Sequence, residues 1–151
     1  MIQKSPDTTK TYIYQAPTIY MTAFYLLLVA WTVISILFMG TKGWVSWIQL
    51  FMVAFILVMT WYFSLGISYR VEINEDGKLE LISFRRVISI HSTKIVMVEG
   101  PHLPLGFIRF RLEREKAYLF CVVKDKTLQQ ILSRIREVNP DIKFKSLHFH
   151  P

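Results

Sequence analysis

From Tyr20 to Met39 the chain reads YMTAFYLLLVAWTVISILFM, a run without any Asp, Glu, Lys, Arg or His. A second uncharged run, WIQLFMVAFILVMTWYFSL, extends from Trp47 to Leu65. A helix of about 20 apolar residues crosses the hydrocarbon core of a bilayer, and each run is close to that length. Both runs are apolar on every side, which argues against amphipathic helices that lie on a membrane surface. The sequence therefore predicts two transmembrane helices.

A cleavable signal peptide is the alternative for the first run. Such a peptide has a short apolar core near the N-terminus and a cleavage site with small residues. Residues 1–19 precede the run and no such site follows it, so a permanent span is favoured. The connector at residues 40–46 is short, which predicts an antiparallel hairpin. We expect the hydroxyl groups of Thr32, Ser35 and Thr60 to bond to their own helix backbone in preference to the other helix.

Aromatic residues stand at the ends of both runs, as they do where membrane helices leave the hydrocarbon core. We expect Trp44 and Trp47 to mark one interface, and Tyr20 and Tyr62 to mark the other. The connector carries one basic residue, Lys42, whereas the opposite flanks carry Lys4, Lys10, Arg70, Lys78, Arg85 and Arg86. Because cytoplasmic flanks are enriched in Lys and Arg, both termini are predicted to face the cytoplasm.

After the second run, apolar residues recur at every second position, which is typical of strands with one buried face. Tyr69, Val71 and Ile73 alternate with polar residues, and the turn signal NEDG follows at residues 74–77. Further strands are predicted over residues 78–83, 85–91, 93–98, 107–112 and 116–123. These make six antiparallel strands. A seventh forms if the alternating tail adds an edge strand instead of remaining a loose end.

The apolar spacing then changes to three and four residues, which predicts a helix over residues 127–138. Thr127 and Gln130 fit a capping box at its start, and Asn139-Pro140 ends it. The apolar face holds Leu128, Ile131, Leu132, Ile135 and Val138. We therefore expect an α+β membrane protein with four parts, which are an N-terminal cytoplasmic segment (1–19), the transmembrane hairpin (20–66), a cytoplasmic sheet domain (67–140) and a C-terminal tail (141–151).

This order of elements resembles the bacterial PH-like (pleckstrin-homology-type) domain family in its membrane-anchored form. The likeness covers residues 20–140 and is carried by Tyr69-Arg70-Val71, the Asp76-Gly77 turn, residues 86–90, Lys94-Ile95 and the helix at 127–138. The resemblance implies a PH-like small β-barrel or sandwich of six or seven antiparallel strands, with one C-terminal capping helix. It also implies a module for protein or lipid interaction at a bacterial inner membrane, of a kind usually without known enzyme activity.

Five arginines are candidate ligands for lipid headgroups. Residues 67–151 hold 15 of the 18 Lys and Arg residues and 10 of the 11 acidic residues, which leaves a net charge of +5 there. A basic domain beside a membrane is attracted to the anionic cytoplasmic leaflet, and guanidinium groups bind phosphate with two hydrogen bonds. The candidates are Arg70, Arg85, Arg86, Arg109 and Arg111. The alternative is an ordinary solvated surface of mixed charge.

Patterns that carry catalysis or metal binding are absent from the sequence. It contains no Ser/His/Asp set, no Gly-rich phosphate loop, and no HExxH or CxxC motif. His148 and His150 could share a strand face, but no third metal ligand is evident. Cys121 lies in an apolar run and is expected to be a buried, inert thiol. We therefore expect no enzyme activity, cofactor, metal, nucleic-acid partner or small-molecule substrate.

The sequence favours a non-enzymatic scaffold or accessory subunit that presents its sheet domain at the cytoplasmic membrane surface. Its expected partners are the lipid bilayer and either other integral membrane proteins or a second copy of the chain. The two spans hold no ionisable residue, which argues against a self-contained transporter. Two alternatives stay open. One is a module that binds or senses lipid headgroups through the arginines, and the other is a subunit of a multi-chain membrane enzyme or transporter.

Overall fold

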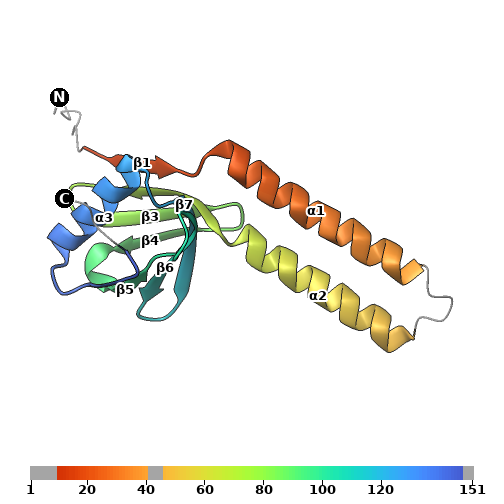
Figure 1. Cartoon of the computed structure of the whole chain (residues 1–151). Coiled ribbons are helices and arrows are strands. Elements are labelled where there is room, and N and C mark those ends of the chain that lie inside the picture. Colours follow the sequence, from red (N-terminus) through yellow and green to blue (C-terminus); the bar gives the residue numbers. More distant parts are fainter. Residues whose placement is uncertain (1–9, 41–45, 148–151) are drawn as a thin grey trace, which may run out of the picture.

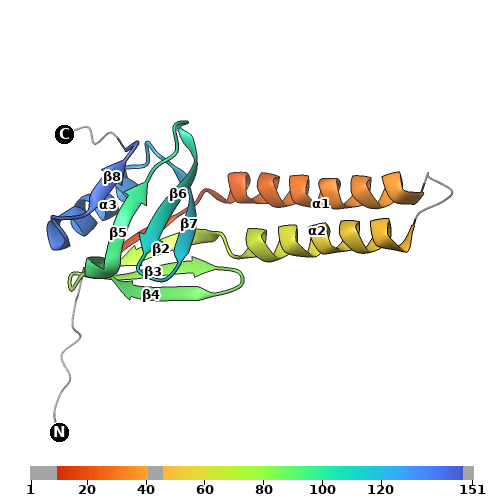
Figure 2. The ribbon, with the colours of Figure 1, turned by 90° about the horizontal axis from the view of Figure 1, so that it is seen from below.

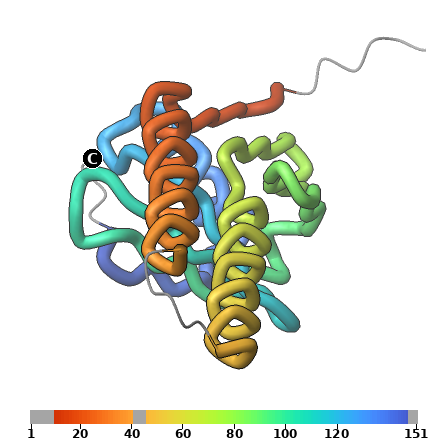
Figure 3. Tube along the Cα trace, turned by 90° about the vertical axis from the view of Figure 1, so that its right-hand side faces the viewer, coloured from red at the N-terminus to blue at the C-terminus, as the bar shows by residue number. Residues whose placement is uncertain are grey.

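The computed structural model describes residues 10–40 and 46–147. Two long helices, α1 (Thr18–Gly40) and α2 (Trp47–Leu65), lie side by side and project from one end of a sheet domain (Figure 1). Seen along the helices, both leave the same side of that domain (Figure 3). Each helix is long and apolar enough to span a membrane, so the two predicted runs are confirmed as helices.

The surface of the two helices is apolar and almost entirely uncovered. Leu27 exposes 71% of its side chain and Trp47 exposes 84%. Buried residues on the described helices are confined to Met21, Leu28 and Ser64. Monomeric soluble proteins rarely expose apolar surfaces of this extent. Such a pair of helices calls for an apolar environment or for partner helices.

Hydroxyl groups on the helices bond to their own backbone, as the sequence predicts. Thr32, Ser35 and Thr60 each donate to the carbonyl oxygen four residues earlier, at 2.9, 2.8 and 2.7 Å. Thr32 Oγ1 also accepts a hydrogen bond across the hairpin from Trp61 Nε1, at 3.0 Å. Trp61 thereby links α2 to α1 within the apolar part of the hairpin.

The sheet domain is one mixed sheet of eight strands in the described residues. The strand order is β4-β3-β2-β7-β6-β5-β8, with β1 joined to β2. Its elements are β1 (Tyr12–Gln15), β2 (Ser68–Ile73), β3 (Lys78–Ser83), β4 (Val87–His91), η1 (Ser92–Lys94, a 3-10 turn), β5 (Ile95–Glu99), β6 (Leu105–Leu112), β7 (Lys116–Val122), α3 (Lys126–Val138) and β8 (Lys143–Lys145). Figure 2 shows β2–β4 running at a steep angle to β5–β7. The core lies between this bent sheet and α3.

The fold is α+β, as predicted, but the expectation of six or seven strands that are all antiparallel is wrong. β2 and β7 pair in parallel, and so do β5 and β8. The second parallel pair is possible because the chain passes through α3 between β7 and β8, and this connection brings β8 back alongside β5 in the same direction. The strand count exceeds the prediction because a strand forms ahead of α1. The C-terminal tail (141–151) does supply an edge strand, β8.

β1 lies in the segment that was expected to precede the hairpin as a separate part. It pairs antiparallel with β2, and the Ala16 amide donates to the Tyr69 carbonyl oxygen at 2.7 Å. Tyr14 is 2% exposed, and its hydroxyl oxygen accepts a hydrogen bond from the Val122 amide at 3.0 Å. The chain therefore enters α1 from the sheet and returns from α2 into the neighbouring strand. The sheet domain includes β1 and β8 as well as residues within 67–140.

The turn between β2 and β3 falls where the NEDG signal predicts it. The Asn74 carbonyl oxygen accepts a hydrogen bond from the Gly77 amide at 3.0 Å. Gly77 has a φ of 79°, in the left-handed region that glycine adopts without strain. A Cβ atom at this position would lie 2.6 Å from Cγ1 of Val138, at the end of α3. Both the backbone angle and the packing therefore require glycine here.

α3 begins one residue before its predicted start. Its N-cap is Asp125, whose carboxylate accepts hydrogen bonds from the amides of Thr127 and Leu128 at 2.8 and 3.1 Å. The predicted capping box of Thr127 and Gln130 is therefore wrong, because Thr127 already lies inside the first turn. The helix ends before Asn139, as predicted. The apolar face predicted from its spacing is confirmed, with Leu128, Ile131, Leu132 and Ile135 buried.

Cys121 is fully buried in the core, which confirms that its thiol is covered. Burial raises the pKa of this thiol from 9.0 to about 12, because the thiolate would lose its hydration. The thiol is therefore neutral at neutral pH. We expect iodoacetamide to modify Cys121 at least about a thousandfold more slowly in the folded chain than in the urea-unfolded chain, since both access and thiolate fraction fall. Mass spectrometry of timed samples measures this ratio, and equal rates would contradict the described burial.

Candidate functional site

A groove of about 440 Å³ lies where the end of α2 meets the sheet domain. Its walls come from the end of α2 and the link to β2, from the turn between β3 and β4, and from strands β6 and β7. The lining combines three apolar side chains with three basic ones, which are Phe63, Ile67, Phe107, Arg85, Arg86 and Lys116. This pairing of apolar and cationic surface distinguishes the groove from the purely apolar surface of the two helices.

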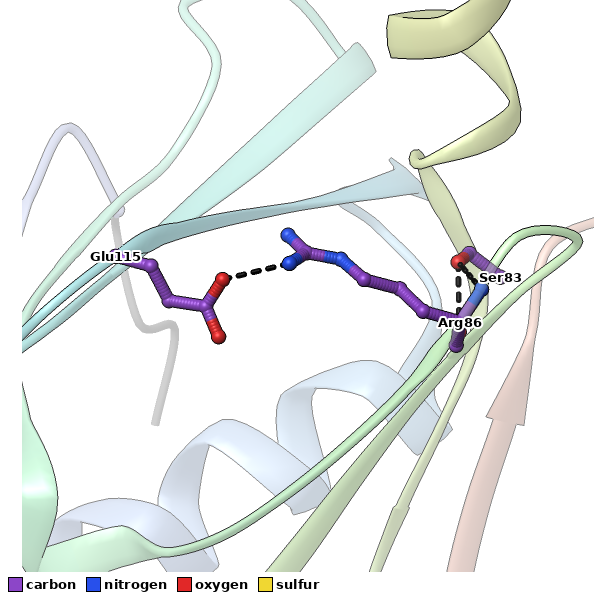
Figure 4. Close-up of polar contacts among 3 residues, drawn as sticks. All are labelled: Ser83, Arg86 and Glu115. Carbon is purple, nitrogen blue, oxygen red and sulfur yellow. Dashed lines mark hydrogen bonds and ion pairs between the residues drawn. The ribbon is translucent and has the colours of Figure 1, made fainter.

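The turn between β3 and β4 carries two of the five candidate arginines and is firmly held. Ser83 Oγ donates to the Arg86 carbonyl oxygen at 2.7 Å and accepts from the Arg86 amide at 3.1 Å (Figure 4). The Arg85 amide donates a hydrogen bond to the carbonyl oxygen of Leu65, which is the last residue of α2, at 3.1 Å. These bonds fix the turn against the end of α2, so both arginine side chains start from a defined position.

Arg85 lies over the last turn of α2. Its guanidinium carbon is 3.9 Å from the centroid of the Tyr62 ring, which is a cation–π contact. A Cβ atom on Gly66 would lie 2.8 Å from Nη2 of Arg85, so the absence of a side chain at Gly66 leaves room for the guanidinium. Arg85 forms no ion pair with any residue that the structure describes. Stacking therefore positions this cation without neutralising it.

Arg86 is partly neutralised. Its Nη1 is 2.6 Å from Oε2 of Glu115, which lies in the loop between β6 and β7 (Figure 4). Arg86 Nε is buried and has no acceptor among the described residues. Lys116 follows Glu115 in the chain, is exposed, and forms no ion pair within the described part of the chain. With three cations and one carboxylate, the groove carries a net positive charge.

Aromatic rings join the helices to the sheet next to this groove. Phe84, in the same turn as the arginines, packs against Tyr25 of α1 and Tyr69 of β2, with ring centroids 5.4 and 4.8 Å apart. Phe107 packs against Phe24 of α1 at 6.2 Å. A hydrogen bond from the Tyr25 hydroxyl to the Ser64 carbonyl oxygen, at 3.1 Å, ties α1 to the end of α2. The groove is therefore built on a rigid joint.

The other three candidate arginines lie outside the groove lining. Arg70 forms an ion pair with Glu72 at 2.6 Å, and Arg109 forms one with Glu99. Arg111 is exposed on β6, where it lies opposite Lys116 in the strand register. The structure thus brings Arg85 and Arg86 together at the end of α2. Arg109 and Arg111 lie on β6, opposite Tyr118 and Lys116 of β7 in the strand register, and Arg109 is already paired with Glu99.

Seven of the nine groove residues were not among the sequence candidates, and three of these seven lie on strands β6 and β7, which are Phe107, Lys116 and Tyr118. Lys116 and Tyr118 alternate with the buried Ala117 and Leu119 on β7, so the period of two did place them on the outward face. No pattern in the sequence says which strand faces the end of α2. That information comes from the pairing of β7 with β6 and β2.

The predicted interface anchors keep their aromatic rings on the surface. Trp47, at the far end of α2, is 84% exposed. Tyr20 and Tyr62, near the sheet domain, are also exposed, and Tyr62 supports Arg85. The fourth predicted anchor, Trp44, lies outside the described residues.

Metal binding finds no support in the described part of the chain, where no three His, Cys, Asp or Glu side chains are grouped to hold an ion. His148 and His150, the pair singled out in the sequence, lie outside the described residues.

The chain matches no family model, no curated protein and no solved structure. The resemblance to the bacterial PH-like family therefore stays a prediction based on the order of elements.

Proposed function

We propose that this protein is a membrane-anchored interaction protein. In this proposal α1 and α2 cross the inner membrane as a hairpin, and the sheet domain stands at its cytoplasmic surface as a scaffold or accessory subunit. The observation that carries the proposal is the contrast between the two halves. Uncharged helices expose side chains such as Leu27 and Phe51 by 70% or more, while the sheet domain buries its own core and carries the charges.

The way the two halves are joined supports the proposal of a presenting role. The hairpin is attached to the sheet at both ends, through β1 before α1 and β2 after α2. Bonds from Ala16 to Tyr69 and from Arg85 to Leu65 cross the joint without a flexible linker. A domain held in this way meets partners on the same membrane at a high effective concentration and in a fixed orientation. We propose other integral membrane proteins, or a second copy of this chain, as those partners.

Washing membranes with alkaline carbonate tests the anchoring. We expect the full chain to stay in the membrane pellet and to be released by detergent. The variant Phe55→Lys/Val58→Lys places two charges at exposed positions of α2, each of which costs about 2.5–3.5 kcal/mol in the middle of a span. This variant should be lost from the pellet, whereas the matched apolar variant Phe55→Leu/Val58→Leu should remain. Release of the unmodified chain by carbonate would contradict the proposal.

Purification of the full chain in mild detergent tests the interaction role, and tags at the two ends test the orientation. A stoichiometric second protein, or a stable second copy, supports the scaffold function. A lone monomer at cellular concentration contradicts it. Tags that are reachable by protease only after the inner membrane is opened support cytoplasmic termini, and tags cleaved in intact spheroplasts contradict them.

A further inference from the structure

We propose that the groove at the end of α2 binds the phosphate of an anionic phospholipid headgroup from the leaflet beside the sheet domain. This inference rests on the proposed membrane anchoring and assigns a ligand to one surface of the anchored protein. The residues assigned to the phosphate are Arg85, Arg86 and Lys116, and the apolar wall of Phe63, Ile67 and Phe107 is assigned to the glycerol and upper acyl region.

The charge of the groove is the first argument. Arg85 and Lys116 form no ion pair with described residues, and Arg86 shares its charge with Glu115 alone. Charge-assisted hydrogen bonds from guanidinium and ammonium groups to phosphate are among the stronger polar contacts in proteins. An anion in the groove would give Arg85 and Lys116 the charged partner that they lack among the described residues.

Arg85 also offsets an unfavourable field. The C-terminal end of α2 faces the groove, and the last carbonyl groups of a helix carry partial negative charge, which repels an anion. The Arg85 guanidinium lies over Gly66, the residue that follows the helix. The backbone amide of Arg85 donates a hydrogen bond to the Leu65 carbonyl oxygen. The cation therefore covers the helix end on the side where the phosphate is assigned.

The second argument is the level of the groove along the membrane normal. α2 has 19 residues, and at 1.5 Å per residue its length is about 28 Å. The hydrocarbon core of a bilayer is about 30 Å thick, so a spanning α2 reaches the headgroup layer at its last turn. Phe63 and Ser64 of that turn line the groove. The basic side chains therefore stand at the level of lipid phosphates.

The mixed lining selects a lipid over a soluble phosphate compound. Phe63 is 66% exposed and Phe107 is 39% exposed, although both border a cationic groove. A water-soluble phosphate would leave this apolar surface in contact with water, whereas a phospholipid covers it. The favourable burial of apolar area adds to the ionic contacts only when the phosphate is attached to a lipid.

Native mass spectrometry of the full chain in detergent micelles tests the inference. The probes are phosphatidylglycerol and phosphatidylcholine with the same acyl chains, and soluble glycerol 3-phosphate. We expect phosphatidylglycerol to bind at least about tenfold more tightly than phosphatidylcholine, since the former retains a net negative charge. The variant Arg85→Gln/Lys116→Gln should weaken phosphatidylglycerol binding about tenfold. Protection of Cys121 from alkylation verifies that this variant is folded.

The variant Lys143→Gln/Lys145→Gln is the matched control, because it removes two exposed cations of the edge strand β8, neither of which lines the groove. We expect it to leave phosphatidylglycerol binding unchanged. Equal binding of the two lipids overturns the inference, and so does an equal loss in the control, which would indicate attraction by overall charge. Binding of glycerol 3-phosphate as tight as that of the lipid assigns the groove to a soluble phosphate compound instead.

The outcome separates this inference from the proposed function. A chain that resists carbonate extraction but does not distinguish the two lipids contradicts the groove assignment alone. A chain that carbonate releases contradicts the anchoring on which both depend.

Discussion

Replacing Tyr14 by alanine is expected to lower the free energy of unfolding of the sheet domain by about 3–5 kcal/mol, the usual range for deletion of a buried aromatic ring. Tyr14 is 2% exposed and lies in the main core. Its hydroxyl also accepts the hydrogen bond from the Val122 amide, which the variant leaves without this partner. Burial raises the pKa of this hydroxyl to about 12, so it is neutral across the physiological range.

Cys121 supplies the measurement, since the chain has one cysteine and the core covers it. The urea dependence of its alkylation in the full chain, held in mild detergent, reports unfolding of the sheet domain. The control is Tyr14→Phe, which keeps the ring and removes the hydroxyl, and should cost about 1 kcal/mol. A loss below about 1 kcal/mol for Tyr14→Ala would show that β1 is not part of the cooperative unit.

The raised pKa of Tyr14 adds a pH dependence of known sign. A group whose pKa is higher in the folded state than in the unfolded state binds its proton more tightly when folded. The stability that comes from burying neutral Tyr14 is therefore present below pH 10, the ordinary pKa of tyrosine. It is lost as the pH rises from 10 toward 12. The Tyr14→Phe variant should show a shallower loss of stability over this alkaline range.

Replacing Ile131 by alanine is the second large effect, with an expected loss of about 2–5 kcal/mol. Ile131 is fully buried at the centre of the apolar face of α3. The smaller side chain removes core contacts and leaves a cavity, while the helix itself is not weakened because alanine has a high helix propensity.

Ser133→Ala on the same helix is the matched control, because Ser133 is exposed. We expect its unfolding free energy to stay within about 0.5 kcal/mol of the unmodified chain. Denaturant titration with Cys121 alkylation as the signal measures both variants. A similar loss in the two variants would contradict the assignment of the effect to core packing at Ile131.

These two residues also show what the sequence could and could not predict. The role of Ile131 follows from apolar residues three and four positions apart, a local pattern that needs no knowledge of the rest of the chain. Tyr14 stands in a strand of four residues, and its hydrogen-bond partner is 108 positions away. The aromatic residues before α1 fit a membrane-interface belt equally well. The pairing of β1 with β2 decides between Tyr14 as a core residue of a strand and Tyr14 as a residue of the membrane interface.

The candidate site divides in the same way. Arg85 and Arg86 could be identified because they are adjacent basic residues that follow the second apolar run closely, although the sequence placed them in a strand over residues 85–91 and the structure places them in the turn before β4. Their partners Lys116 and Phe107 could not, because a period of two assigns a side chain to a face and not to a neighbour. The sequence also suggested Arg109 as a headgroup ligand, but could not show that Arg109 forms an ion pair with Glu99, because this pair depends on the register of β5 against β6.

The pairing of β1 with β2 has a mechanical consequence. A domain connected to a helix by a single chain segment can rotate about that segment. The sheet domain is connected to both helices, through β1 before α1 and β2 after α2, so it cannot rotate without twisting the hairpin. Any force that tilts α1 against α2 must therefore shear β1 along β2, and a slip of one residue there would turn every side chain of the shorter strand to the opposite face. The orientation of the sheet domain about the long axis of the hairpin therefore follows from the positions of α1 and α2.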